Sequence, residues 1–444
     1  MTSSEAGGEN VPDSQASALR KITRRLIPFL FVLYVIAWLD RVNIGFAALQ
    51  MNRDLKISEA AAGFGFGVFF LGYCLFEVPS NLVLARLGAR IWISRIMITW
   101  GLISTGMMFV RTPTEYCILR FLLGAAEAGF FPGVVYYLTL WYPAAHRARA
   151  VAAFMTAVPV TGLIGGPLSG WLLGLNGVQG LAGWQWLFLC EGLPAVLLGV
   201  IVLFYLTDRP ELASWLTQSE RNYIVDELAR ERRIHGDTHF AKCESKQFAS
   251  IWNALTNPII LKLGIIFFLA AIGFLGYSLW APLVIQSLTG ASDLGVGMIL
   301  GGISAATIVF MLLNGRHSDR ADERWIHTAV PLLIMGVGFL GCALLKMPLL
   351  AIIFLALVPI GHCSAYGPFW SIPSKFLSGP AAAAGTAMVV TIANVGGFLG
   401  PTMIGWLKKH TGTHSAAFLI LGAFGVLAAA VAFAGRSQTA NGHE

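Results

Sequence analysis

The sequence predicts an all-α membrane protein with twelve transmembrane helices. Of its 444 residues, 56% are hydrophobic and only 12% are charged, whereas soluble proteins carry about 25% charged residues. The mean hydropathy is +0.70. Apolar runs of about 20 residues, each long enough to cross a bilayer core of about 30 Å, recur along the whole chain. The net charge of +7 is therefore assigned to the loops of a membrane protein, and we expect no nucleic-acid partner.

The apolar segments divide into two groups of six, separated by one long polar stretch. We expect spans near 26–48, 61–84, 91–110, 116–140, 149–174, 184–206, 259–288, 294–313, 327–345, 349–370, 383–407 and 414–435. The spans form an N-terminal bundle (26–206) and a C-terminal bundle (259–435). Residues 207–258 mix both charge signs and are predicted to be a cytoplasmic linker. We expect a flexible cytoplasmic N-terminus (1–25), with no cleaved signal peptide, and a cytoplasmic tail (436–444).

Basic residues gather in alternate loops, which predicts the orientation of the chain. One side receives Arg20, Lys21, Arg24, Arg25, Arg86, Arg90, Arg147, Arg149, Arg316, Arg320, Arg324 and Lys375. The other side receives fewer: Arg53, Lys56, Arg111, Lys346, Lys408 and Lys409. The richer side of a membrane protein faces the cytoplasm. We therefore expect a multi-pass protein of a bacterial inner membrane, with both termini in the cytoplasm.

The two groups of spans carry matching landmarks at one offset. Arg86 follows the second span and Arg320 follows the eighth, 234 residues later. Glycines spaced four apart precede Pro167 in the fifth span and Pro401 in the eleventh, again 234 residues apart. Two landmarks at the same offset indicate an internal repeat of six helices.

Four charged residues lie inside apolar spans: Asp40, Arg41, Arg120 and Glu127. Each such residue costs roughly 2.5–3.5 kcal/mol on membrane-insertion scales. Arg120 and Glu127 are seven residues apart, so they share one face of a helix. The alternative to a functional role is a buried ion network that only sets helix register.

The second half has no matching charges. An offset of 234 from these four positions leads to Phe274, Leu275, Phe354 and Gly361. Because only one half carries the charges, we interpret them as functional. Two arginines can bind an anion, and two carboxyl groups can carry protons, as a proton-coupled anion transporter requires.

Other polar and aromatic residues in the spans have a functional and a packing interpretation. The candidates for substrate binding are Tyr73, Tyr277, Trp370 and Asn394. The alternative for the aromatic residues is packing inside the bundle, and for Asn394 an interhelical hydrogen bond. We interpret His362 as an interhelical hydrogen-bond partner, and Glu77 and Glu191 as structural.

Signals for catalysis or metal binding are missing from the sequence. It contains no HExxH, GxSxG or Walker A motif and no paired His/Cys spacing. We therefore expect no enzyme activity, no metal and no cofactor, and we expect an ion gradient to drive transport. A nutrient sensor built on a transporter fold is a further alternative, although the large cytoplasmic domain that would favour it is not seen.

Three segments carry a family resemblance. Residues 39–47 read LDRVNIGFA, residues 76–81 read FEVPSN and residues 120–133 read RFLLGAAEAGFFPG. These strings resemble the first, second and fourth helices of the anion:cation symporter family within the major facilitator superfamily. The resemblance covers essentially the whole chain. It is strongest to the branch that includes transporters of tartrate, phthalate and 4-hydroxyphenylacetate.

The resemblance implies a fold, an activity and roles for residues. It implies two pseudo-symmetric six-helix halves and import of a small carboxylate by proton symport with alternating access. By matching position, Arg41 contacts the substrate carboxylate, Asp40 and Glu127 carry protons, and Arg120 is the charge partner on the fourth helix. Sodium coupling, anion exchange and sugar-acid transport remain open. We expect a monomer.

The loop motif of the superfamily, Gly-x-x-x-Asp-Arg-x-Gly, is incomplete after the second span, where Ala85 replaces the aspartate. It persists better after the eighth span as Gly315, Asp319 and Arg320. The resemblance therefore implies a cytoplasmic gate built from Arg86, Asp319 and Arg320.

Overall fold

The computed structural model describes residues 11–234, 258–345, 347–372 and 379–440. Among these residues, every regular element is a helix, and twelve helical segments are long and apolar enough to cross a membrane. The predicted fold class, an all-α membrane protein with twelve spans, is therefore confirmed. Most of the expected linker between the halves (235–257) lies outside the described residues, as do 1–10 and 441–444.

The first half contains six spans, two of which are divided. Its long helices are α1 (Val11–Asp54), α2 (Glu59–Leu87), α3 (Ala89–Gly106), α4 (Pro113–Glu127), α5 (Phe130–Trp141), α6 (Ala144–Met155), α7 (Ala157–Leu173) and α8 (Gly183–Tyr205). Short 3₁₀ turns, η1 (Met107–Phe109) and η2 (Val178–Gly180), lie in the connections. The fourth span is α4 followed by α5, and the fifth runs from α6 into α7.

Local sequence explains where several helices begin and end. The Ser58 hydroxyl accepts a hydrogen bond from the amide of Ala61 (3.3 Å) at the start of α2. Thr112 caps α4 in the same way. Pro113 lies in the first turn, where its missing backbone N–H removes no hydrogen bond within the helix. Gly88, with φ of 91°, separates α2 from α3. Side-chain caps of this type satisfy backbone amides that the helix leaves free.

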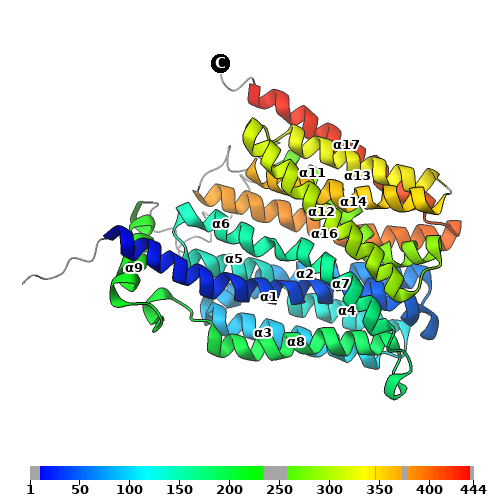
Figure 1. The fold of residues 1–444 in the computed structure, drawn as a ribbon, viewed down its shortest axis with the longest axis horizontal. Coiled ribbons are helices and arrows are strands. Elements are labelled where there is room, and N and C mark those ends of the chain that lie inside the picture. Colours follow the sequence, from blue (N-terminus) through cyan, green and yellow to red (C-terminus); the bar gives the residue numbers. More distant parts are fainter. Residues whose placement is uncertain (1–10, 235–257, 346, 373–378, 441–444) are drawn as a thin grey trace, which may run out of the picture.

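The second half contains six undivided spans after a short surface region. The surface region consists of η3 (Pro210–Leu212) and α9 (Gln218–Ile234). The spans are α11 (Pro258–Thr289), α12 (Asp293–Ala321), α13 (Ile326–Leu344), α14 (Pro348–Ser371), α16 (Gly379–Thr411) and α17 (Ser415–Ala440). The helices of both halves run roughly along one axis, and the halves lie side by side (Figure 1).

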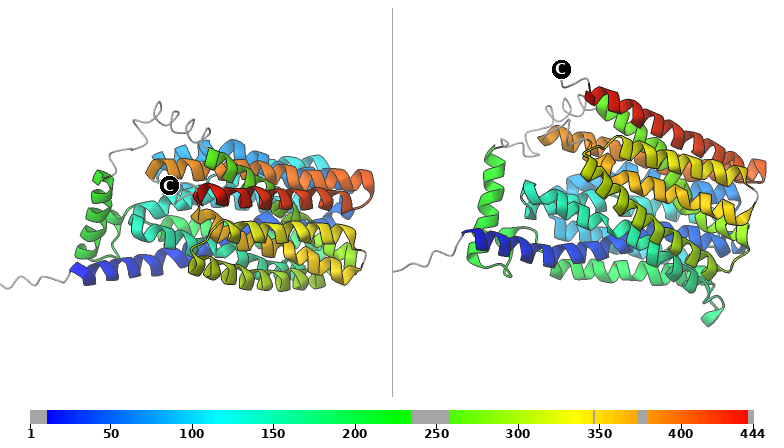
Figure 2. Two further views of the ribbon diagram at one scale, coloured as in Figure 1. Left: turned by 90° about the horizontal axis from the view of Figure 1, so that it is seen from above. Right: turned by 45° about the horizontal axis from the view of Figure 1, so that its top comes forward.

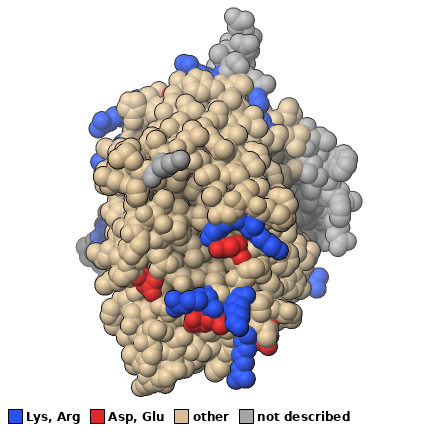
Figure 3. Space-filling model, turned by 90° about the vertical axis from the view of Figure 1, so that its right-hand side faces the viewer, with Lys and Arg blue, Asp and Glu red and all other residues tan. Residues whose placement is uncertain are grey.

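The two ends of the bundle differ. Helix α9 and the beginning of α1 lie at one end, which we call the linker end, and α17 ends toward that end too (Figure 2). The opposite end, which we call the far end, carries the short loops before α2, α8 and α12. On the far-end face, acidic and basic side chains lie next to one another (Figure 3).

Close contacts between the halves lie toward the far end. Helix α2 packs on α16 and α7 packs on α12. A methyl group on Gly63 would lie 2.9 Å from the Cα of Gly405, and one on Gly166 would lie 2.6 Å from the carbonyl oxygen of Gly297. Only glycine permits backbones to approach so closely. These positions are near the far ends of their helices, so the halves are packed tightly there.

The N-terminal region differs from the sequence-based expectation. Residues 1–25 were expected to be flexible, yet α1 is helical from Val11 onward. The ammonium group of Lys21 lies 2.8 Å from a carboxylate oxygen of Glu220 on α9, and the hydroxyl of Ser17 donates to Glu220 (2.7 Å). These contacts attach the first turns of α1 to the surface helix, which explains why they are ordered as helix.

Candidate functional site

The fourth span is interrupted at Glu127. Helix α4 ends at this residue, Ala128 and Gly129 form a turn, and Gly129 has a φ of 88° before α5 begins. A Cβ at Gly129 would also collide with the hydroxyl of Ser80, so glycine is required for two reasons. Pro132 is tolerated because it lies in the first turn of α5. The break places the Glu127 carboxyl group at a helix end inside the bundle.

Arg41 of α1 forms an ion pair with Glu127. The side chain of Glu127 is 1% exposed, whereas that of Arg41 is 15% exposed. The guanidinium carbon of Arg41 lies 5.1 Å from the ring centre of Trp38 and 5.3 Å from that of Tyr73. Aromatic rings at this range attract a cation. The structure thus brings together the predicted residues Arg41, Glu127 and Tyr73, and leaves one face of Arg41 accessible.

Asp40 points to a different set of partners. It is fully buried, and one carboxylate oxygen accepts hydrogen bonds from the amide of Asn43 (3.1 Å) and from the hydroxyl of Ser104 on α3. Its other oxygen has no hydrogen-bond partner among the described residues. Asp40 therefore lies behind Arg41, in the interior of the first half.

Arg120 does not pair with Glu127 in this structure, although the sequence suggested it as the charge partner. Its Nε donates to the carbonyl oxygen of Gly65 (3.3 Å), and its guanidinium lies 4.8 Å from the ring centre of Phe69. Helical side chains lean toward the helix N-terminus, so Arg120 leans away from a residue seven positions later. Its two terminal nitrogens are buried without hydrogen-bond partners in the described part of the chain.

Two residues near this cluster were missed or underrated by sequence reasoning. Tyr366 of α14 lies within electrostatic range of Arg41, so the second half supplies an aromatic residue to the site. Glu77 of α2, interpreted as structural, lies beside Asn394 of α16 and within range of Arg41. The predicted residue Asn394 is thus placed at the junction of the halves. Glu77 lies within the FEVPSN string, which was the available signal.

The other predicted aromatic residues belong to a cluster in the second half. The His362 ring stacks on Phe274 at 4.1 Å, and Tyr277 stacks on the same phenylalanine at 6.5 Å. Trp370 lies 6.4 Å from Tyr366, centre to centre. Trp370 therefore adjoins the residue that approaches Arg41, whereas the described contacts of Tyr277 stay within its own half.

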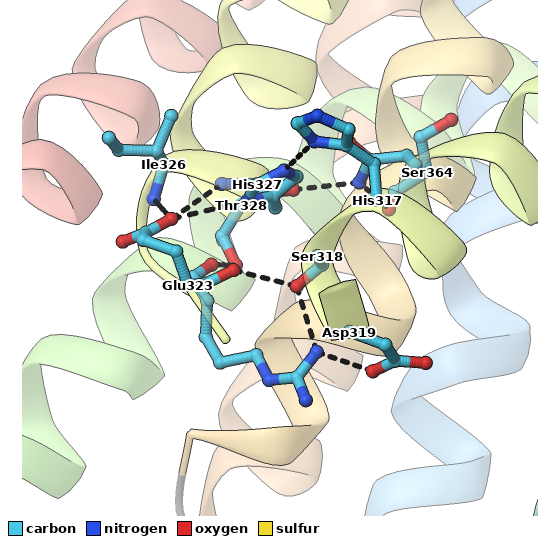
Figure 4. A network of polar contacts seen from close by, with 10 residues as sticks. His317, Ser318, Asp319, Glu323, Ile326, His327, Thr328 and Ser364 are labelled. Carbon is cyan, nitrogen blue, oxygen red and sulfur yellow. Dashed lines mark hydrogen bonds and ion pairs between the residues drawn. The ribbon is translucent and has the colours of Figure 1, made fainter. Parts of the chain in front are cut away.

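The predicted gate residues lie at the linker end. A side-chain oxygen of Asp319 is 2.6 Å from a guanidinium nitrogen of Arg324, in a polar network that includes Ser318, Glu323 and His327 (Figure 4). The Asp319 side chain is 72% exposed. The network holds the loop between α12 and α13 together from within.

Arg86 and Arg320 are exposed as well. Arg86 borders a cavity of about 480 Å³ between the first half and α9, which Asp208 and Arg209 also line. Among the described residues, Asp319 contacts Arg324 of its own half. The gate residues of the two halves therefore do not meet at the linker end in this structure.

Comparison with known proteins identifies the family. Residues 30–401 match the model of the Major Facilitator Superfamily. The chain belongs to the major facilitator superfamily. A protein of Agrobacterium vitis named "Putative tartrate transporter" is 47% identical over 403 residues, which are 91% of this chain and 88% of that protein.

Other relatives of this superfamily member also match over nearly the whole chain. A Pseudomonas putida protein named "Putative metabolite transport protein NicT" is 42% identical over 92% of this chain and 93% of its own. A solved bacterial homologue of the lysosomal transporter Spinster, in an inward-facing and unoccupied conformation, superimposes with a TM-score of 0.73 at 18% identity. That comparison covers 96% of this chain and 97% of the other, and it shows the fold.

Membership in the superfamily settles the general class. The protein is a multi-pass membrane protein and a secondary transporter of a small molecule, and it is not an enzyme. The predicted family resemblance is confirmed. Transporters of this fold build their sites between two repeats near the middle of the bilayer. Tyr366 of the second half lies within electrostatic range of Arg41, so the cluster lies where the two halves meet.

Proposed function

We propose that the protein imports a small organic carboxylate by proton symport with alternating access. The observation that carries the proposal is the ion pair between the partly exposed Arg41 and the buried Glu127. The exposed face of Arg41 is available to an anion, whereas its buried face already neutralises an acid. Substrate binding and proton binding therefore meet at one guanidinium group.

Competition for Arg41 supplies the coupling. A guanidinium group can form two parallel hydrogen bonds to a planar carboxylate, and an ionised Glu127 and a substrate carboxylate would share its single positive charge and its N–H donors. A proton on Glu127 removes the negative charge that holds Arg41, and Arg41 is then free to bind the substrate. Linkage requires the converse, so bound substrate favours the protonated form of Glu127.

Asp40 and Arg120 complete the charge set. The four charges comprise two acids and two bases, and Arg120 lies within electrostatic range of both Asp40 and Glu127. The unpartnered nitrogens of Arg120 can stabilise either acid after it loses a proton. We assign Glu127 as the main coupling residue and Asp40 as the second one.

The substrate class rests on the cluster and on the relatives. Trp38, Phe69 and Tyr73 surround the Arg41 guanidinium with aromatic surface, and Asn394 and Glu77 add polar groups. A relative with 47% identity is named for tartrate. We therefore propose a hydroxy-dicarboxylate or an aromatic carboxylate. A sugar-acid symporter or an anion exchanger would use the same arginine and is the second candidate.

The contacts between the halves support one state of the transport cycle. The halves are packed at the far end, and the gate residues do not meet at the linker end. Since the basic loops assign the linker end to the cytoplasm, we propose that this is an inward-facing state of a monomer in a bacterial inner membrane, with cytoplasmic termini.

The test is uptake by purified protein in liposomes. Labelled tartrate and a labelled aromatic carboxylate are offered under a proton gradient alone and under a Na⁺ gradient alone. The proposal requires accumulation with the proton gradient and none with the Na⁺ gradient. Accumulation that depends on Na⁺, or exchange without net uptake, would contradict proton symport.

A further inference from the structure

A third acid, interpreted from the sequence as structural, lies buried in the first half and has no part in the proposed coupling. Glu191 of α8 is 2% exposed, and one of its oxygens accepts a hydrogen bond from the hydroxyl of Ser169 on α7 (2.8 Å). Its other oxygen is buried without a hydrogen-bond partner among the described residues. A packing role explains the bond to Ser169, but an uncharged residue could make that bond as well.

Among the described residues, the neighbours that act on Glu191 include another acid, Asp40, and no basic side chain. From α1, Asp40 lies within electrostatic range of Glu191, and the amide of Asn43 is close enough to interact with it. From α7 the neighbour is Ser169, and α3 presents the hydroxyls of Ser104 and Thr105 at this level. A carboxylate without a cation is costly in a bilayer, so this environment favours a group that holds a proton.

Asn43 connects the two acids. Its amide nitrogen donates to Asp40 (3.1 Å), and the same side chain adjoins Glu191. Helix α3 also joins the two positions, because the Ser104 hydroxyl donates to Asp40 and a Cβ on Gly192, the residue after Glu191, would lie 2.7 Å from the hydroxyl oxygen of Thr105. A water molecule in this polar region would be the bridge for proton transfer between the two acids.

Helix geometry places Glu191 nearer to the far end than Asp40. Glu191 is eight residues from Gly183, the far-end start of α8, or about 12 Å at 1.5 Å per residue. Gln50 of α1 adjoins Gly183, and Asp40 is ten residues from Gln50, or about 15 Å. A proton that enters from the far end thus comes to Glu191 before Asp40.

We propose that Glu191 is a proton relay between the far end and Asp40. This inference rests on the proposed proton symport. In the relay step, protonated Glu191 gives its proton to the Asp40 carboxylate, which leaves Glu191 as carboxylate and Asp40 as carboxylic acid. Glu191 then takes a new proton from the far-end side. Asn43 cannot relay protons efficiently and acts as a positioning residue.

The experiment compares three variants in liposomes. Glu191→Gln keeps an oxygen for the Ser169 bond but cannot release a proton, Glu191→Asp restores the acid, and Ser169→Ala removes the structural bond while leaving the acid. We expect Glu191→Gln to retain substrate counterflow but to lose about tenfold in the initial rate of pH-driven uptake, which about 1.4 kcal/mol of added barrier produces. Glu191→Asp should recover most of that rate, and Ser169→Ala should keep it.

Two results would overturn the relay. One is wild-type pH-driven uptake in Glu191→Gln, and the other is an equal loss of counterflow and pH-driven uptake in both Glu191→Gln and Ser169→Ala, which would indicate packing alone. If the wild-type protein itself shows no pH-driven uptake, the result contradicts the proposed proton symport, on which the relay depends.

A measurement on the wild-type protein tests the relay without a variant, so it still applies if a variant does not fold. Hydrophobic carbodiimides react with protonated carboxyl groups, and mass spectrometry locates the product. The relay requires labelling of Glu191 that decreases as the pH is raised. Labelling of Glu191 that does not change with pH would contradict it, because a relay must lose its proton.

Discussion

Arg41 and Glu127 form an ion pair between α1 and the end of α4, and the arginine is the more exposed partner. The helix break at Gly129 is part of this arrangement, because it ends α4 at Glu127 in the interior of the bundle. One positive group therefore serves an internal acid on one side and is open to an anion on the other.

Replacing Arg41 should weaken substrate binding. Lysine keeps the charge but loses the planar fork that matches a carboxylate, so Arg41→Lys should cost roughly 1.5–3 kcal/mol, or about 10-fold to 150-fold in Kd. Titration calorimetry on purified protein measures the change. Arg95→Lys is the control, since Arg95 stacks on Trp92 at 3.8 Å, away from the cluster. Wild-type affinity in Arg41→Ala would show that Arg41 does not hold the substrate.

Asp319 should affect the conformational balance and not the choice of substrate. Its exposed carboxylate contacts Arg324 within one loop here, and the gate role assigns it a contact across the halves in the other state. Asp319→Asn should favour the state that is open at the linker end about two- to fivefold, from roughly 0.5–1 kcal/mol. Distances between spin labels at the linker end report the balance, with Asp322→Asn as a charge control in the same loop. A changed ranking of competing substrates would contradict the gate role.

Polar contacts at the far end should stabilise the state seen here. The amide of Gln50 donates to Asp293 of the other half (2.7 Å), and Lys408 lies 2.7 Å from Glu59. Gln50→Ala should increase the population that is open at the far end about two- to tenfold, from roughly 0.5–1.5 kcal/mol. Lys408→Ala should have a smaller effect, because the pair is partly exposed.

Spin labels on the 174–182 and 412–414 loops measure this opening. Lys409→Ala is the matched control, since it removes an exposed charge next to Lys408. Equal label distances in Gln50→Ala and wild type would mean that the far-end contacts do not hold this state.

Attachment of α9 to α1 should depend on pH. Burial acts to raise the pKa of Glu220, but hydrogen bonds from Lys21, Ser17 and Thr217 outweigh it and lower the pKa to about 2. The ordinary pKa of a glutamate is 4.5, and the pKa in the folded protein is lower. The attachment is therefore complete above pH 4.5 and is lost as Glu220 becomes protonated when the pH falls toward 2.

Glu220→Gln should weaken the attachment at neutral pH by roughly 1.5–3 kcal/mol, the range for hydrogen bonds to charged groups. Hydrogen exchange of residues 218–234 measures it. Glu227→Gln is the control, because Glu227 pairs with the exposed Arg230 on the same helix. Unchanged protection of α9 in Glu220→Gln would show that these bonds do not attach it.

The sequence predicted the spans well because length and hydropathy alone define a membrane helix. It did not predict the break in the expected span 116–140, although Gly129 and Pro132 were visible, because both residues also occur within continuous membrane helices. The early start of α1 was missed for another reason. The contacts of Ser17 and Lys21 with Glu220 join residues about 200 positions apart.

The sequence predicted most of the residues that form the site, but it did not predict which of them form ion pairs with one another. Spacing along α4 placed Arg120 and Glu127 on one face. The Arg120 side chain points away from Glu127, however, and Glu127 forms its ion pair with Arg41. Tyr366 was missed since α14 is apolar on all sides, and a helix of that kind does not reveal which face meets the other half. Glu191 was interpreted as structural because its proximity to Asp40 depends on how α1 and α8 pack.

The most direct test of proton coupling through Glu127 is transport by Glu127→Gln in liposomes, with counterflow and pH-driven uptake measured on the same preparation. Glutamine mimics the protonated acid, leaves Arg41 free for the substrate and cannot release a proton. We predict that the variant binds substrate, exchanges it across the membrane, and does not accumulate it under a proton gradient. Accumulation at the wild-type level would contradict the assignment of Glu127 as the coupling residue.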